Sequence, residues 1–194
     1  MKRLTLLLFF ACITILSFPQ HRNINFKYGS ISENIGSSQP KRIVSENQSF
    51  VQVSYDFHDA AIFEIKQDFD EYQLLRINGL SIMEDTGKPA LPCYNDIIVV
   101  PQKEGLNIKI LEADYREYDD FLIFPALPPQ PDNEKDTITD FTIDRITYST
   151  NAYYPSEIVE ILSVQDYREI PLAFIQIRPI QYNPKTRKIR CYSN

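Results

Sequence analysis

Few residues in this sequence of 194 are suited to chemistry, and their spacing does not favour it. The histidines are His21 and His58, and neither lies in a metal-ligand pattern such as H-E-x-x-H or C-x-x-C. Cys93 and His58 could form a thiolate–imidazole dyad on paper, since an imidazole can activate a thiol. A cysteine just after a Leu-Pro pair and a lone histidine at a strand edge are more typical of structural residues. The sequence therefore predicts no catalytic residue, and we do not expect this chain to be an enzyme.

Cofactor and nucleic-acid sites are not indicated either. The five glycines are scattered singly, so no glycine-rich loop is available to hold a phosphate. Close acidic pairs could supply Ca²⁺ ligands, although acidic loop residues are mostly solvated surface: Asp56 with Asp59, Asp68 with Asp70, and Asp119 with Asp120. A net charge of -6 leaves no broad positive surface to neutralise phosphates. We expect no cofactor, no metal and no nucleic-acid partner.

The start of the chain has the pattern of a secretory signal peptide over residues 1–20. Two basic residues at 2–3 precede a nearly apolar run over 4–18. That run suits a signal and is short for a membrane-spanning helix, which needs ~20 apolar residues. We expect cleavage between 17 and 22, passage through the periplasm, release outside the cell or at its surface, and no membrane contact after cleavage. A lipoprotein anchored at Cys12 is the alternative, although the apolar run continues past that residue.

Two cysteines, Cys93 and Cys191, remain once the signal is removed. In an oxidising compartment they could pair, but a disulfide needs a narrow range of Cα separations that spacing along the chain does not reveal. We favour the other interpretation, in which they are two partly buried thiols on separate strands.

The remaining sequence divides into a flexible leader over 21–47 and a β domain over 48–194. The leader is rich in Ser, Asn and Gln and has no sustained hydrophobic period. From residue 49 onward short runs alternate apolar and polar residues, as in a strand with one buried face. Strands are predicted over 51–55, 61–66, 72–77, 96–100, 106–111, 121–124, 158–164, 172–180 and 187–192.

Turn signals join some of these runs into hairpins. Gly105 indicates a hairpin between 96–100 and 106–111, and Asn183-Pro184 indicates another between 172–180 and 187–192. In the second hairpin we expect Ile175 and Ile177 to face Ile189 and Cys191. Many short strands, no internal repeat and few amphipathic helices predict an all-β fold, an antiparallel β-sandwich or jelly-roll-like domain.

A proline-rich segment from Pro125 to Asp136 interrupts the strands. Its prolines cannot donate ladder hydrogen bonds and favour an extended, stiff and exposed backbone. The segment is either a surface crossover with no task or a projection that enters a partner's groove with little further loss of entropy. The residues in question are Pro128, Pro129, Pro131, Asp132, Asn133 and Lys135.

Three separated motifs resemble the pro-domain of the gingipains, secreted cysteine endopeptidases of Bacteroidetes-type bacteria. The first resembles G-x-P-x-L-P and comprises Gly87, Pro89, Leu91 and Pro92. The second resembles F/Y-P-x-E and begins at Tyr154 and Pro155. The third resembles P-x-Q-Y-N-P-x-T over 179–186 and includes Gln181, Tyr182, Asn183 and Pro184.

This resemblance implies a β-rich pro-domain that assists folding of a peptidase and keeps it latent by occluding its active-site cleft. It also implies a caspase-like catalytic domain, often followed by a sorting domain for type IX secretion, that is absent from this chain. In arginine-specific relatives a basic side chain of the corresponding loop occupies the specificity pocket. Here Lys135 is the only cation near Asp132 and Asn133.

A different class of function is a cell-surface β-sandwich that binds a glycan or a protein and has no link to a peptidase. Such a module needs an exposed aromatic platform. The candidate pairs are Tyr153 with Tyr154 and Tyr115 with Tyr118.

Overall fold

Antiparallel strands make up almost all of the regular secondary structure. The computed structural model describes residues 22–29, 31–32, 41–46, 50–129 and 141–193, and the predicted signal peptide over 1–20 lies outside these residues. Of the described residues, 51% lie in strands and 3% in a helix, which confirms the predicted all-β antiparallel class. No helix among the described residues is long and apolar enough to cross a membrane.

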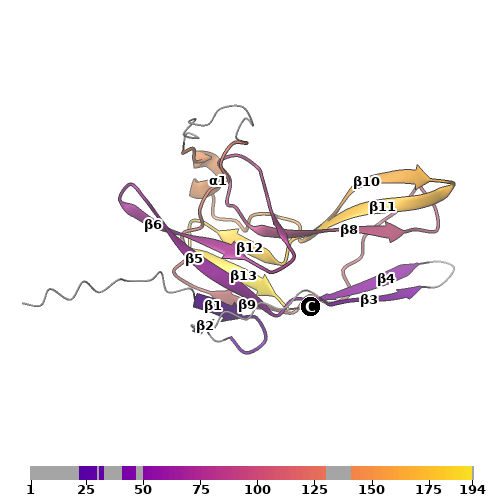
Figure 1. Ribbon diagram of the computed structural model, residues 1–194, viewed down its shortest axis with the longest axis horizontal. Helices are drawn as coiled ribbons and strands as arrows, with labels where there is room; N and C mark the ends of the chain where they lie inside the picture. The colour runs from indigo at the N-terminus through magenta and orange to yellow at the C-terminus, as the bar shows by residue number, and fades with distance from the viewer. Residues whose placement is uncertain (1–21, 30, 33–40, 47–49, 130–140, 194) are drawn as a thin grey trace, which may run out of the picture.

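The strands form four sheets arranged around a common core (Figure 1). One four-stranded sheet has the order β2-β1-β5-β6, with β1 (Arg22–Asn25), β2 (Ile31–Ser32), β5 (Asp59–Gln67) and β6 (Asp70–Arg76). The hairpin β3 (Lys41–Glu46) and β4 (Val51–Asp56) precedes β5 in the chain. A second four-stranded sheet has the order β10-β11-β8-β7, with β7 (Ser81–Ile82), β8 (Pro92–Val99), β10 (Val159–Tyr167) and β11 (Ile170–Ile177). The order β12-β13-β9 joins β9 (Tyr115–Tyr118), β12 (Ile180–Asn183) and β13 (Lys188–Tyr192), and one short helix, α1 (Arg145–Ser149), precedes β10.

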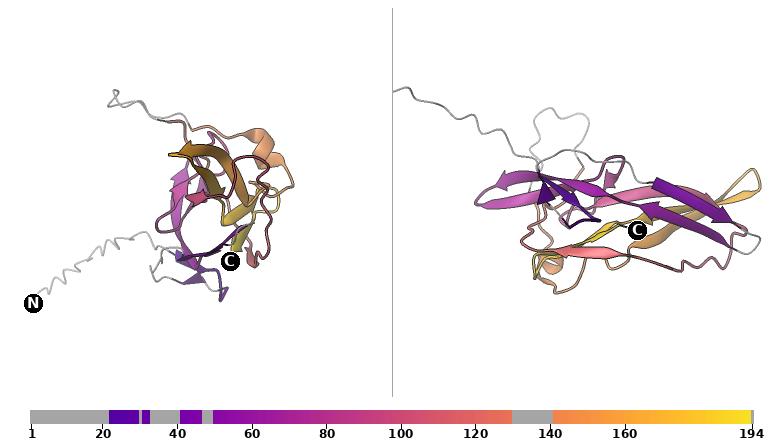
Figure 2. Two further views of the ribbon diagram at one scale, coloured as in Figure 1. Left: turned by 90° about the vertical axis from the view of Figure 1, so that its right-hand side faces the viewer. Right: turned by 90° about the horizontal axis from the view of Figure 1, so that it is seen from below.

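The two sides of the sandwich meet in one hydrophobic core. Viewed along the long axis, the purple strands β3 to β6 lie on one side and the orange and yellow C-terminal strands on the other (Figure 2, left). Ile62 and Leu75 from the first side and Ile180 and Ile189 from the second are fully buried. Burial alternates along β13, as expected of a strand with one face toward the core. Ile189 and Cys191 are buried, whereas Lys188, Arg190 and Tyr192 are half-buried on the other face.

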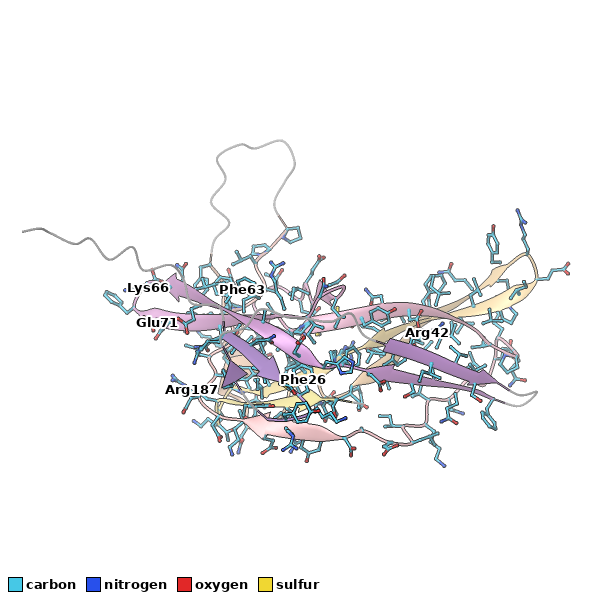
Figure 3. The ribbon with its side chains drawn as sticks, turned by 60° about the horizontal axis from the view of Figure 1, so that its bottom comes forward. Phe26, Arg42, Phe63, Lys66, Glu71 and Arg187 are labelled. Atoms are coloured by element: carbon cyan, nitrogen blue, oxygen red, sulfur yellow. The ribbon has the colours of Figure 1, made fainter. Side chains whose placement is uncertain are left out.

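Polar contacts join the β3–β4 hairpin to the facing strand β8. The Tyr55 hydroxyl donates to Asp96 Oδ2 at 2.7 Å, and Arg42 Nε lies 2.5 Å from the same oxygen (Figure 3). The rings of Tyr55 and Tyr94 meet edge to face with centroids 5.7 Å apart. These contacts hold the two sides of the sandwich together at the end away from β6.

The prediction of a flexible leader over 21–47 is wrong where β1, β2 and β3 form, since β2 pairs with β1 and β3 pairs with β4. The strand β1 reaches furthest into the core. This strand pairs with β5 from Arg22↔Ile62 to Asn25↔Asp59, and Ile24 and Phe26 are buried in the core (Figure 3). The peptide N–H of Phe26 also donates to the carbonyl of His58 at 2.8 Å. A four-residue strand is too short to show a hydrophobic period, and its partner is distant in the sequence, so local patterning did not reveal it.

The hairpin predicted between 96–100 and 106–111 is also wrong. Strand β8 pairs instead with β11 from Tyr94↔Ile177 to Val99↔Leu172, and 106–111 contains no strand. Pairing with β11 places Ile98 against the core, which the exposed residues Ile108 and Ile110 do not achieve. Burial in a central sheet therefore outweighs the local turn at Gly105.

The strand predicted over 172–180 is divided between two sheets. It leaves β11 at Arg178-Pro179, where Pro179 has no N–H to continue the ladder, and enters β12. The residues that face β13 are therefore Ile180, opposite Cys191, and Tyr182, opposite Ile189, so the predicted pairing of Ile175 and Ile177 is wrong. The predicted turn is confirmed, because Asn183 Oδ1 accepts from the peptide N–H groups of Lys185 and Thr186.

Both late cysteines are free and buried, Cys93 on β8 and Cys191 on β13. This confirms the interpretation as two thiols on separate strands. Burial raises the pKa of both thiols, so the reactive thiolate form of Cys93 is disfavoured.

Candidate functional site

The proline-rich segment leaves the sandwich at Pro125-Ala126 and returns at Phe141–Asp144. Of the residues predicted to act in it, Pro128 is partly buried and Pro129 is exposed. Pro131, Asp132, Asn133 and Lys135 lie outside the described residues. The site is therefore built from the two ends of this segment and the residues that hold them.

The outgoing end is fixed by a short antiparallel ladder with the first sequence motif. Gly87 N donates to Ala126 O and Ala126 N donates to Lys88 O, both at 2.8 Å. The N–H of Ala90 donates to Phe124 O at 2.9 Å, and Pro89 and Pro125 face each other in this ladder as fully buried residues. The chain cannot leave the sandwich at another point without breaking these bonds.

The returning end is bound to the same glycine. Asp144 N donates to Gly87 O at 2.8 Å, so the two ends of the segment meet at one residue. Gly87 has a φ of 79°, and an added Cβ would lie only 2.9 Å from Asp144 N. The position requires glycine both for its conformation and for the close approach of the returning backbone.

Asp144 ends the returning segment by capping α1. Its carboxylate accepts from Ile146 N at 3.0 Å and from the Thr147 hydroxyl at 2.9 Å. The hydrogen bond from the Thr147 side chain is the main interaction that lowers the pKa of Asp144. An acidic residue before a short helix is a recognised N-cap signal, which sequence reasoning could have used here.

Aromatic contacts anchor both ends to the sandwich. The Phe141 ring packs against the rings of Tyr72 and Phe124, each with centroids 5.6 Å apart. The Tyr148 hydroxyl on α1 donates to Ile123 O at 2.7 Å. These residues escaped sequence reasoning because their partners are brought together only by the fold.

The second and third sequence motifs contact each other close to the two anchored ends of the segment. Tyr154 and Tyr182 form an isolated antiparallel bridge, and Gln181 Nε2 donates to Pro155 O at 2.7 Å. The Tyr182 hydroxyl, fully buried, donates to Phe121 O at 2.9 Å, just before the outgoing segment. The Tyr154 hydroxyl donates to Asp85 Oδ2 at 2.8 Å, beside the first motif. The three motifs thus form one continuous support.

The other motif residues have structural positions. Leu91 is fully buried and its carbonyl accepts from Met83 N at 2.8 Å. Pro92 opens β8 and pairs with Ile82. Pro184 is buried in the turn that Asn183 organises. None of these residues places a nucleophile or base at the segment, so what the arrangement can do is fix the points where the segment leaves and rejoins the sandwich.

The four tyrosines proposed as a glycan platform do not form two exposed pairs. Tyr118 is buried, with its hydroxyl donating to Asn25 O at 2.9 Å. The ring of Tyr154 has Lys88 Nζ over it at 5.7 Å from the centroid. Tyr115 and Tyr153 instead turn their rings toward Arg190. Neither predicted pair offers a flat surface for stacking a sugar ring.

The sequence of this chain is similar to that of one protein family and of several curated proteins. The sequence model of the Propeptide_C25 family matches residues 33–194. Gingipain R2 of Porphyromonas gingivalis is 21% identical over 159 residues, which cover 81% of this chain and 21% of that protein. Gingipain R1 of the same species is 22% identical over 149 residues, covering 77% of this chain and 15% of that protein. The chain thus spans about a fifth or less of the length of these curated relatives.

Solved structures show a similar fold. One, described as a complex of Porphyromonas gingivalis RgpB pro- and mature domains, has a TM-score of 0.73 at 19% identity and covers 80% of this chain and 81% of that chain. Another, described as showing the zymogenic latency of gingipain K from Porphyromonas gingivalis, has a TM-score of 0.66 at 17% identity and covers 90% of this chain and 94% of that chain.

Proposed function

The chain belongs to the Propeptide_C25 family, and from this premise we propose that it is the pro-domain of a secreted, gingipain-like cysteine endopeptidase. In this role it assists folding of the peptidase and keeps it latent by occluding the active-site cleft. The observation that carries the proposal is the double attachment of the proline-rich segment, both ends of which are hydrogen-bonded to Gly87.

The attachment of both ends lowers the entropy that the segment loses on binding. A free loop loses conformational freedom when it is ordered in a partner's cleft, and that loss weakens binding. Here the two ends are already fixed at one residue, Gly87, and the prolines at 128, 129 and 131 restrict the backbone between them. A segment held in this way is suited to fill a groove at low entropic cost.

The side chain that enters the cleft belongs to the same proposal. We assign Lys135 to the specificity pocket, because it is the cation of the segment, with Pro131, Asp132 and Asn133 leading to it. The partner is then a peptidase whose pocket accepts a basic side chain. Export directed by residues 1–20, passage through the periplasm, and type IX secretion to the surface or the medium complete the proposed role.

Inhibition of the cognate peptidase domain by recombinant 22–194 tests the proposal. Micromolar domain is expected to slow hydrolysis of a peptide substrate, and Lys135→Ala is expected to raise the inhibition constant by more than about tenfold, or about 1.4 kcal/mol. Lys103→Ala is the matched control, since Lys103 is an exposed lysine paired with Asp166. No slowing by the unmodified domain would contradict the proposed function, and an unchanged constant for Lys135→Ala would exclude that residue from the pocket.

A further inference from the structure

The outer face of the β12-β13-β9 sheet carries tyrosines grouped around one arginine. In the ladder between β13 and β9, Arg190 lies opposite Glu117 and Tyr192 lies opposite Tyr115. The Arg190 guanidinium carbon is 3.8 Å from the ring centroid of Tyr153 and 4.8 Å from that of Tyr115. We refer to Tyr115, Tyr153, Arg190 and Tyr192 as the Tyr–Arg cluster.

Hydrogen bonds hold the cluster in place. Glu117 Oε1 accepts from Arg190 Nε at 2.9 Å and from the Tyr153 hydroxyl at 2.8 Å. The Tyr192 hydroxyl donates to Gln181 Oε1 at 2.6 Å, and the Tyr115 and Tyr192 rings have centroids 5.3 Å apart. Side chains that are already ordered lose little entropy when a partner covers them.

The cluster remains open to solvent in spite of these contacts. Tyr115 is 47% exposed, and the Arg190 side chain is 29% exposed. Tyrosine and arginine are enriched among the residues that contribute most to protein–protein binding, particularly near the centre of an interface. The inward residues of β13, Ile189 and Cys191, already attach this strand to the core because both are fully buried. The fold therefore does not by itself require tyrosines and an arginine on the outer face of the sheet.

The cluster is continuous with the residues that anchor the two ends of the proline-rich segment. Tyr153 adjoins Tyr154, whose hydroxyl is bonded to Asp85, and Lys88 next to Gly87 lies over the Tyr154 ring. A stable protein partner covers about 20 to 30 residues on each side. The segment between Ala126 and Asp144 has fewer residues than this. A peptidase domain that binds the segment stably therefore also contacts the surface of this chain next to it.

We propose that the Tyr–Arg cluster is a second docking surface for the peptidase domain, in addition to the proline-rich segment. The inference rests on the proposed function and adds to it a contact outside the active-site cleft. Its effect is to set the orientation in which the segment meets the cleft and to strengthen binding of the domain.

Alanine variants of the cluster test this inference with the cognate peptidase domain. Tyr115→Ala and Arg190→Ala are each expected to raise the inhibition constant by about tenfold or more. Tyr167→Ala is the matched control, because Tyr167 is 60% exposed and has Arg168 over its ring, but lies at the β10–β11 turn in another sheet. Its inhibition constant is expected to stay within about twofold of the unmodified value.

Thermal melting of each variant separates binding from folding. Should Arg190→Ala unfold, Tyr115→Ala still gives the answer, because Tyr115 is 47% exposed and its truncation removes little buried surface. Folded Tyr115→Ala and Arg190→Ala that inhibit as well as the unmodified domain would overturn the second docking surface and leave the proposed function standing. An unmodified domain that does not inhibit would remove both.

Discussion

Tyr154 and Tyr182 exchange two backbone hydrogen bonds of 2.8 Å, although they belong to segments that are distant in the sequence. This bridge joins the turn after α1 to β12, and the Tyr154 hydroxyl continues the connection to Asp85. The base of the proline-rich segment is thereby coupled to the hydrophobic core rather than to a surface loop. Substitutions in this support are expected to change the direction of the segment as well as stability.

Gly87→Ala is expected to destabilise the domain by about 2 to 4 kcal/mol. The new Cβ would lie 2.9 Å from a backbone nitrogen, in addition to the strain of a φ of 79°. Gly105→Ala is the control, because Gly105 has a φ of 71° but its nearest neighbour, Gln102 Nε2, would be 3.7 Å away. Urea denaturation that gives equal losses for the two variants would contradict the close approach at Asp144.

Tyr182→Phe is expected to lower the free energy of unfolding by about 1 to 2 kcal/mol. The change removes the hydroxyl of a fully buried tyrosine, so Phe121 O loses the hydrogen bond that this hydroxyl donates. Tyr167→Phe, at an exposed turn, should have no measurable effect. Equal unfolding midpoints for Tyr182→Phe and the unmodified domain in urea would show that this hydrogen bond contributes nothing.

Ile24→Ala tests whether β1 belongs to the fold. Ile24 is fully buried, so the truncation is expected to cost about 2 to 4 kcal/mol of stability. Ile31→Ala is the control, because Ile31 is paired with Ile24 in the ladder but is 46% exposed on β2. Matching melting temperatures for the two variants would place β1 outside the cooperative core.

Alkaline pH is expected to destabilise the domain through its tyrosines. Burial raises the pKa of Tyr118 and Tyr182 from 10.0 to about 12. The folded state therefore keeps protons that the unfolded chain loses, and this contribution to stability is complete below pH 10 and is lost as the pH rises toward 12. Melting temperatures should fall through this interval, and less so in Tyr118→Phe; a melting temperature that is constant from pH 10 to 12 would refute the shifts.

Local chemistry accounts for the parts of the fold that sequence reasoning predicted. The turn at Asn183-Pro184 depends on side-chain and ring properties of those two residues, and it forms as expected. The strand predicted over 61–66 lies within β5, where a continuous buried run is followed by alternation between partly buried and exposed residues. Such a pattern forms a strand when the fold also supplies pairing partners, as β1 and β6 do for β5, whereas the alternating run over 106–111 pairs with none of the described strands and forms no strand.

Partner choice accounts for the errors. Three features that were predicted wrongly depend on contacts between distant segments. They are the strand β1, the pairing of β8 with β11, and the passage from β11 to β12 at Pro179. The same holds for the site, since motif residues such as Gly87 were identified by resemblance while Phe141 and Asp144, which hold the returning end, were not. Asp144 acts through the close approach of its backbone to Gly87, and Phe141 acts through its ring contacts with Tyr72 and Phe124. Both depend on contacts between distant segments, which composition and hydrophobic period do not encode.

Replacement of residues 128–140 by a Gly-Ser linker of equal length tests the central claim most directly, because Ala126, Phe141 and Asp144 remain to close the base. The inhibition constant of this variant for the cognate peptidase domain should rise by more than about a hundredfold, or about 2.7 kcal/mol, while its melting temperature stays close to that of the unmodified domain. A folded variant that inhibits as strongly as the unmodified domain would contradict occlusion of the cleft by this segment.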